Sequence, residues 1–134
     1  MITEDYVSFE TAKLLKEKGF NESCYTYYDD IDDSINRFDK GYHFNNTSYP
    51  WGVPYDISKA KKYIVAPTLQ MAMKWLREVH NLWCEISPEG KGLWYREAYS
   101  LTDEEYIPNS NGHKIKSYEE AVEAALKYSL ENLI

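Results

Sequence analysis

The spacing of apolar residues in the middle of the chain predicts a helix over residues 68–80. Five apolar residues recur there at intervals of three and four, which places them along one stripe of a helix. They are Leu69, Ala72, Met73, Leu76 and Val79. Pro67 disfavours a helix that begins earlier, and the Thr68 hydroxyl can cap the first free amides. Such an amphipathic helix needs an apolar surface to lie on.

The period changes from 3.6 to 2 directly after this helix, and the change predicts a strand over residues 82–87. Leu82, Cys84 and Ile86 occupy alternate positions and should face the helix. Trp83 lies between them in sequence and should point to the opposite face. We expect this helix and strand to form the centre of the core.

Capping signals mark one helix near each end of the chain. Ser8 can cap a helix that runs to residue 18, and Gly19 follows where a helix end often needs positive φ. Ser117 and Glu120 form the S-x-x-E pattern of a capping box at the start of the last helix. Both helices are expected to pack on a sheet.

Two further segments have the composition of strands. Residues 24–28 are rich in β-forming residues, and residues 93–101 follow a turn that contains two glycines. The second segment should pair antiparallel with residues 82–87. Its more apolar face, which we expect to point inward, carries Leu93, Tyr95, Glu97, Tyr99 and Leu101. Trp94 would then share the outer face with Trp83.

The order of these elements is helix, strand, long loop, helix, strand, strand, helix. This order predicts an α+β fold in which an antiparallel sheet of three or four strands carries about three helices, mainly on one face. At 134 residues, we expect a single domain over residues 1–134. The long loop, about residues 30–66, can include one short strand at 42–44, and residues 106–107 can form another.

Charge and hydropathy narrow the range of partners. The chain has 22 acidic and 15 basic side chains, a net charge of −7, and this balance disfavours nucleic acid because phosphates bind Lys and Arg. Nowhere do 18 apolar residues follow one another, so we expect no membrane span. The first residues do not resemble a signal peptide. We therefore expect a cytoplasmic protein in which Cys24 and Cys84 are reduced thiols.

The ionisable residues show no pattern typical of a catalytic or metal site. The two cysteines and three histidines are scattered singly, whereas a structural zinc site uses local pairs. Cys84 lies within a predicted strand, where a thiol is buried and inert, and no basic residue adjoins Cys24. The sequence therefore favours a protein that is not an enzyme and has no cofactor. A small thiol-dependent or hydrolytic enzyme is the less favoured alternative.

Aromatic residues are the remaining candidates for a function. The chain has 13 tyrosines and four tryptophans, and aromatic side chains on an open sheet can stack on a partner. The candidate interaction surface joins a proline-flanked loop to two strand tryptophans: Tyr49, Trp51, Tyr55, Trp83 and Trp94. We favour an arrangement in which residues 42–66 fold over the outer face and bury it. If that face is open instead, the net charge favours a protein over nucleic acid.

Three segments of the chain are distinctive: TLQMAMKWLREVH at residues 68–80, SYEEAVEAALK at 117–127 with ENLI at 131–134, and SFETAKLLKEKGF at 8–20. Together they resemble a set of small proteins from gut Bacteroidales and their phages or mobile elements. Residues 75–78 are the most distinctive part, and residues 29–57 and 102–116 are not covered. The set has no assigned activity, so the resemblance implies a bacterial or phage cytoplasmic setting and assigns no catalytic residue.

These observations favour a non-enzymatic accessory or interaction protein that acts by protein–protein contact. One alternative is a binder of carbohydrate or single-stranded nucleic acid through the aromatic face and loop. The other alternative is the small enzyme named above. The sequence predicts neither the identity of the partner nor an oligomeric state.

Overall fold

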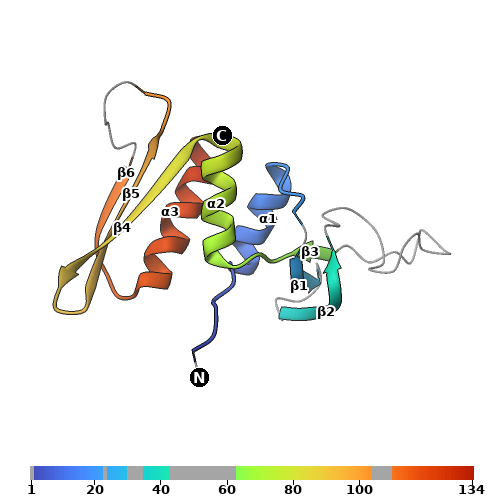
Figure 1. Cartoon of the computed structure of the whole chain (residues 1–134). Helices are drawn as coiled ribbons and strands as arrows, with labels where there is room; N and C mark the ends of the chain where they lie inside the picture. The colour runs from blue at the N-terminus through green and yellow to red at the C-terminus, as the bar shows by residue number, and fades with distance from the viewer. Residues whose placement is uncertain (1, 23, 30–34, 43–62, 104–109) are drawn as a thin grey trace. The chain divides into compact units, whose positions relative to one another are not determined.

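The computed structural model describes residues 2–22, 24–29, 35–42, 63–103 and 110–134 (Figure 1). The chain divides into two compact units, which we describe separately. The N-terminal unit spans Tyr6–Pro67, and the C-terminal unit comprises Thr68–Ile134 together with the first five residues. The single domain expected over residues 1–134 stays a prediction.

In the N-terminal unit the described residues form one helix and three strands. The helix is α1 (Phe9–Glu17), and the strands are β1 (Cys24–Asp29), β2 (Ile35–Tyr42) and β3 (Tyr63–Val65). The strands form an antiparallel sheet in the order β2-β1-β3. The Ser8 hydroxyl accepts a hydrogen bond from the Thr11 amide, as the capping signal predicts.

Two buried hydrogen bonds fasten strand β1 within the N-terminal unit. The Tyr28 hydroxyl donates to the Val7 carbonyl at 2.8 Å, so this buried tyrosine keeps a partner for its polar end. The Thr26 hydroxyl donates to the carbonyl of Ala66, which follows β3. Val7 and Ala66 are themselves fully buried, and the unit therefore has its own small core.

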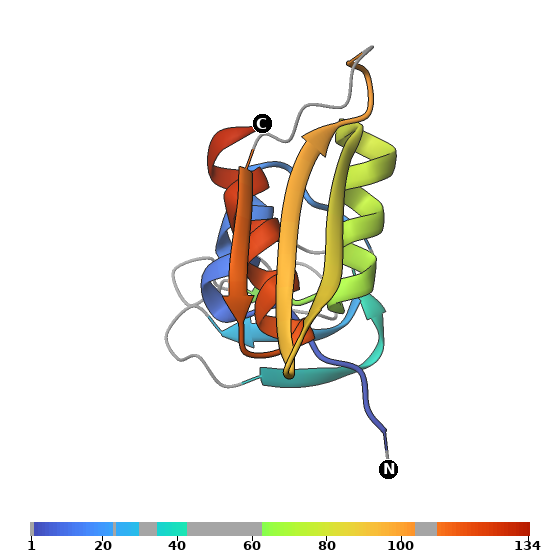
Figure 2. The same ribbon diagram turned by 90° about the vertical axis from the view of Figure 1, so that its left-hand side faces the viewer.

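In the C-terminal unit two helices and three strands are formed by the residues that the structure describes. In chain order they are α2 (Leu69–His80), β4 (Leu82–Gly90), β5 (Leu93–Ser100), β6 (Ser110–Ile115) and α3 (Tyr118–Asn132). The strands form an antiparallel sheet in the order β4-β5-β6. Both helices lie on one face of this sheet, with α2 beside the edge strand β4 (Figure 2).

The ends of the two helices agree with the sequence signals. The Thr68 hydroxyl accepts from the Met71 amide, and the Ser117 hydroxyl accepts from the Glu120 amide. Helix α2 ends at Asn81, whose φ of 55° lies in the left-handed region, and the chain then turns directly into β4. The predicted change from helix to strand is confirmed.

The inward face of β4 is as predicted, but that of β5 is not. Leu82 is buried, and the Cys84 sulfur lies 3.9 Å from the Ser129 hydroxyl on α3. On β5 the fully buried residue is Ala98, which pairs with Cys84. The inward set is therefore Trp94, Arg96, Ala98 and Ser100, and the prediction of an inward tyrosine face is wrong. Counting apolar residues failed because α3 needs a small residue beneath it.

The α+β class, the antiparallel pairing and the three helices are confirmed. Instead of one sheet of three or four strands, the described residues form two sheets of three. Strands β2 and β3 fall within residues 30–66, where the sequence suggested mainly a loop. The suggested strand at 42–44 lies outside the described residues except for Tyr42, which ends β2, and the one at 106–107 lies wholly outside them. No helix in the described ranges is long and apolar enough to cross a membrane.

Candidate functional site

A groove runs beside the edge strand β4 in the C-terminal unit. Its volume is about 370 Å³, and α2, β4 and the first residue of α3 line it. We call it the edge groove, and the lining residues that matter here are Gln70, Met73, Lys74, Arg77, Trp83 and Ile86. Strand β4 pairs only with β5 among the described residues, so the groove lies along an open edge of the sheet.

The helix wall of the groove comes from a second stripe of α2. Residues 70, 73, 74 and 77 have the spacing i, i+3, i+4, i+7 and lie beside the buried stripe. Met73 and Arg77 are half-buried, and Lys74 is exposed. The Lys74 ammonium lies 4.0 Å from the Glu78 carboxylate, but both side chains are about 60% exposed, so water weakens this pair. The wall therefore presents one apolar side chain and two cations.

The strand wall is organised around Trp83. Its indole nitrogen donates a hydrogen bond of 2.8 Å to the Glu85 carboxylate, which also accepts from the Ser87 hydroxyl at 3.3 Å. These three residues alternate along β4 and share its outer face. The guanidinium of Arg77 lies 5.8 Å from the centre of the Trp83 ring. Because α2 packs on the inner face, this contact passes around the free edge of β4.

The outer face of the sheet is both aromatic and acidic. Trp83 pairs directly with Tyr99 across the strands, and Glu85 pairs with Glu97. Burial and the two carboxylates together raise the pKa of Tyr99 above its ordinary value. Because carboxylates repel phosphates, this face is unsuited to an anionic ligand.

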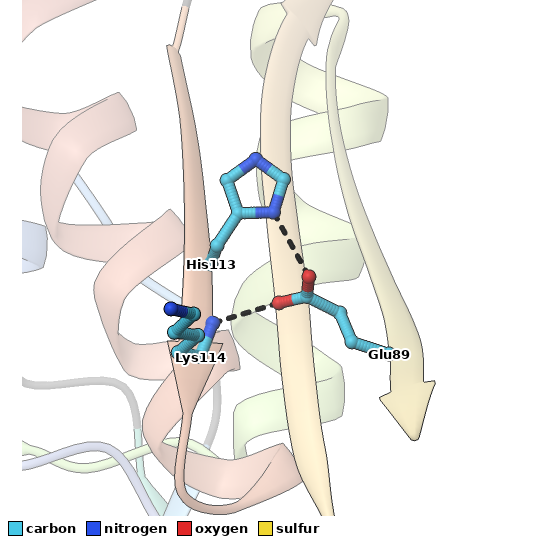
Figure 3. Close-up of polar contacts among 3 residues, drawn as sticks. All are labelled: Glu89, His113 and Lys114. Atoms are coloured by element: carbon cyan, nitrogen blue, oxygen red, sulfur yellow. Dashed lines mark hydrogen bonds and ion pairs between the residues drawn. The ribbon is translucent and has the colours of Figure 1, made fainter. Parts of the chain in front are cut away.

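A carboxylate anchors the far end of the same sheet (Figure 3). Glu89 accepts one hydrogen bond from His113 Nδ1 at 3.0 Å and another from the Lys114 amide at 2.7 Å. These bonds lower the pKa of Glu89. Lys114 has a φ of 56°, so Glu89 holds β6 at a point where its backbone turns out of regular strand geometry. We assign this cluster a structural role.

The two described residues of the predicted interaction surface, Trp83 and Trp94, lie on opposite faces of the sheet. Trp83 lies in the edge groove. Trp94 lies on the inner face, where its ring meets that of Tyr118 edge-on at 5.4 Å, so the prediction that it shares the outer face is wrong. Tyr49, Trp51 and Tyr55 lie outside the described residues.

The sequence reasoning missed the helix side of the groove. The spacing of residues 70, 73, 74 and 77 indicates a second stripe on the helix, but the predicted core stripe already includes Met73. The stripe is rotated from the predicted one: Trp75 is buried, whereas Val79 is 53% exposed. That rotation turns Met73 and Arg77 toward the strand edge.

The two thiols are in environments that oppose reactivity. Burial, helped by the charge of Glu22, raises the pKa of Cys24 to about 12. Burial raises the pKa of Cys84 to about 11, although Ser129 and Arg96 act in the opposite direction. A thiol nucleophile needs a lowered pKa instead. Within the described ranges no three His, Cys, Asp or Glu side chains gather in a way that could hold a metal ion.

Comparison with models of protein families, with curated proteins and with solved structures gave no match to this chain.

Proposed function

We propose that this protein acts by contact with a partner protein, without catalysing a reaction, and that the edge groove is its contact site. The observation that carries the proposal is the edge of β4 beside Met73, Arg77 and Trp83, which no strand of the described residues pairs with. The setting that we propose is the cytoplasm of a bacterium, with the protein serving as an accessory, adaptor or inhibitor of bacterial or phage origin.

The composition of the groove supports a protein partner. Trp and Arg are the residue types that most often dominate the energy of protein interfaces, and Arg77 and Trp83 are already in contact here. A half-buried methionine adapts to partners of different shape. The groove is also within the range of about 300–1,000 Å³ typical of ligand sites, so it can take a side chain or a short segment.

The chemistry of the described residues favours a binding role over the enzyme alternative. Both cysteines have raised pKa values, which makes the thiolate scarce at neutral pH. Glu85, the acid in the groove lining, accepts hydrogen bonds from Trp83 and Ser87. A carboxylate engaged in this way is held as a structural acceptor.

The second candidate function is carbohydrate binding on the outer face. The directly opposed pair Trp83 and Tyr99 offers aromatic surface, and Glu85 and Glu97 offer hydrogen-bond acceptors beside it. The same carboxylates disfavour single-stranded nucleic acid, whose phosphates they repel. A sugar ligand would bind almost independently of salt, whereas nucleic acid would lose affinity steeply as salt rises.

Affinity capture tests the proposed function. Tagged full-length protein and its Arg77→Glu variant would be used to capture proteins from bacterial lysate, with Lys116→Glu as control. Lys116 is exposed in the same unit, lies away from the groove lining and gives the same change of charge. We expect a defined protein to be captured by the wild type and by Lys116→Glu and to be lost with Arg77→Glu. Equal capture by all three proteins, or no reproducible partner, would refute the proposal.

A further inference from the structure

The hydrogen bonding of β4 shows which of its backbone groups are directed away from β5. The Leu101 amide donates to the Asn81 carbonyl at 2.7 Å, so residues 81 and 101 form a hydrogen-bonded pair. In an antiparallel ladder such pairs alternate with non-hydrogen-bonded ones. In the register of β4 and β5, residues 83, 85 and 87 therefore bond to β5. The N–H and C=O groups of Leu82, Cys84 and Ile86 point to the other side.

The position of Pro88 agrees with this alternation. Pro88 pairs with Trp94 in the same register and belongs to the set whose amide side points away from β5. A proline has no N–H to donate, so it is tolerated on an edge strand at such a position. Pro88 and the bulge that follows it also end the regular edge. The usable edge thus extends from residue 82 to residue 86, about 13 Å of strand.

The two edges of this sheet are not equally open. β6, at the other edge, is interrupted by Lys114 in the left-handed region and by a shift of register against β5. Both features discourage another strand from pairing there. β4 is regular between residues 82 and 86, and no described residue pairs with its free side; the Arg77 side chain, which lies over Trp83 at this edge, would move aside for an added strand. An exposed, regular strand edge is the kind of surface to which an extended peptide adds as a further strand.

The charges beside this edge select the kind of peptide. Lys74 and Arg77 line the groove on the helix side, and the pair of Lys74 with Glu78 is weak because it is exposed. Glu85 is engaged with Trp83 and Ser87 on the outer face. A segment lying in the groove would therefore meet two cations on the helix side. Met73 and Ile86 between them offer apolar contact.

We propose that the edge groove binds an extended, acidic segment of a partner protein, which pairs with β4 as an additional strand. This proposal rests on the proposed function and names the kind of partner. On the face that it turns toward α2, at every second position, the segment carries both apolar side chains, which contact Met73 and Ile86, and carboxylates, which contact Arg77 and Lys74. Two copies of this chain paired edge to edge would instead bring the cationic residues of two α2 helices together, which disfavours a second copy as the occupant.

Peptide selection on the intact protein tests this proposal. A random library of displayed ten-residue peptides would be selected against the full chain, and the most enriched peptide would be synthesised. We expect the enriched sequences to carry both apolar residues and Asp or Glu at alternate positions, which lie on one face of the added strand. We expect Arg77→Glu to lower the affinity for the synthetic peptide at least tenfold. Lys116→Glu should change this affinity less than threefold. An absence of enriched peptides, or enrichment of basic or proline-rich ones, would overturn the proposal.

Amide hydrogen exchange measures the strand pairing without a substitution. In the free protein we expect the Cys84 and Ile86 amides to exchange faster than those of Trp83 and Glu85, and the peptide should slow exchange at 84 and 86 selectively. An Ile86→Pro variant loses one free N–H but no hydrogen bond to β5. It should bind the peptide with at least tenfold lower affinity. Slow exchange at 84 and 86 in a peptide-free dimer would identify a second copy as the occupant and overturn the proposal.

The two proposals can fail separately. If lysate capture still depends on Arg77 while the selected peptide leaves exchange at 84 and 86 unchanged, the contact function stands and strand addition is wrong. If neither capture nor peptide binding depends on Arg77, the groove itself is the wrong site.

Discussion

The Arg77 guanidinium on α2 lies over the Trp83 ring on β4, 5.8 Å from its centre, and so joins a helix to the edge of the sheet that it covers. A cation over a partly exposed aromatic ring contributes about 0.5–1 kcal/mol. The contact also holds the Arg77 charge at the mouth of the edge groove. The same residue therefore affects both stability and binding, and the two effects can be separated by experiment.

We predict that Arg77→Ala lowers the free energy of unfolding by about 0.5–1 kcal/mol. In the Trp83→Leu background, Arg77→Ala should leave the free energy of unfolding almost unchanged, because the ring that Arg77 contacts is absent. Urea denaturation of the two single variants and the double variant would measure this coupling. Lys74→Ala, one turn earlier on the same helix, is the control and should couple to Trp83→Leu by less than about 0.3 kcal/mol. Additive effects of Arg77 and Trp83 would contradict the contact.

Trp83 and Trp94 illustrate how far the sequence predicts the faces of this sheet. The alternation in β4 correctly predicts that Leu82 and Cys84 point inward and Trp83 outward. In β5 both faces carry large side chains, so alternation alone does not identify the inner one. The register decides it: Ala98 lies opposite Cys84 under α3, and this places Trp94 inside. A pairing between strands is a tertiary property that the pattern of one strand does not contain.

The assignment of the β5 faces predicts losses of stability of different size at two adjacent residues. Ala98 is fully buried, so Ala98→Leu should overpack the space beneath α3 and lower the free energy of unfolding by about 1–3 kcal/mol. Tyr99→Leu, on the outer face, keeps a large apolar side chain and should lower the free energy of unfolding by less than about 1 kcal/mol. Urea denaturation would compare the two variants directly. A larger loss for Tyr99→Leu would mean that the tyrosine face is the inner one.

The helices could be predicted from the sequence because their signals are local. Ser8, Thr68 and Ser117 each cap the helix that they were expected to cap. Strand β6 could not be predicted, because its sequence SNGHKI contains an Asn-Gly pair typical of turns and little apolar alternation. It forms since β5 offers an edge to pair with and Glu89 holds its irregular end. The edge groove could not be predicted for a related reason. It forms only where α2 and β4 lie side by side, and that is a tertiary arrangement.

The two cysteines should react slowly with iodoacetamide in the folded protein. With a pKa of about 11, only about one Cys84 thiol in 1,000 is ionised at pH 8, and Cys24 is less ionised still. A free thiol with a pKa of about 8.5 is about one-quarter ionised at that pH. The rate of alkylation, measured by mass spectrometry, should therefore be at least about 100-fold lower in native protein than in urea. Rapid alkylation of either thiol in the native state would restore the thiol-enzyme alternative.

The Glu89 cluster predicts a loss of stability in acid. Its hydrogen bonds to His113 and to the Lys114 amide favour the ionised carboxylate, so the pKa of Glu89 in the folded protein lies below its ordinary value of 4.5. A group with a lowered pKa stabilises the folded state above its ordinary pKa, and this contribution disappears as the pH falls through the folded-state pKa. We therefore expect Glu89→Gln to be less stable than wild type at pH 6–7.

The difference between wild type and Glu89→Gln should shrink as the pH falls below the ordinary value of 4.5 and should vanish once the carboxyl is protonated in both states. Urea midpoints measured between pH 3 and pH 7 would follow this convergence. Glu119→Gln, an exposed change in the first turn of α3, supplies the control for loss of one negative charge. A gap between wild type and Glu89→Gln that stays constant with pH would mean that the hydrogen-bond geometry, and not the charge of Glu89, secures β6.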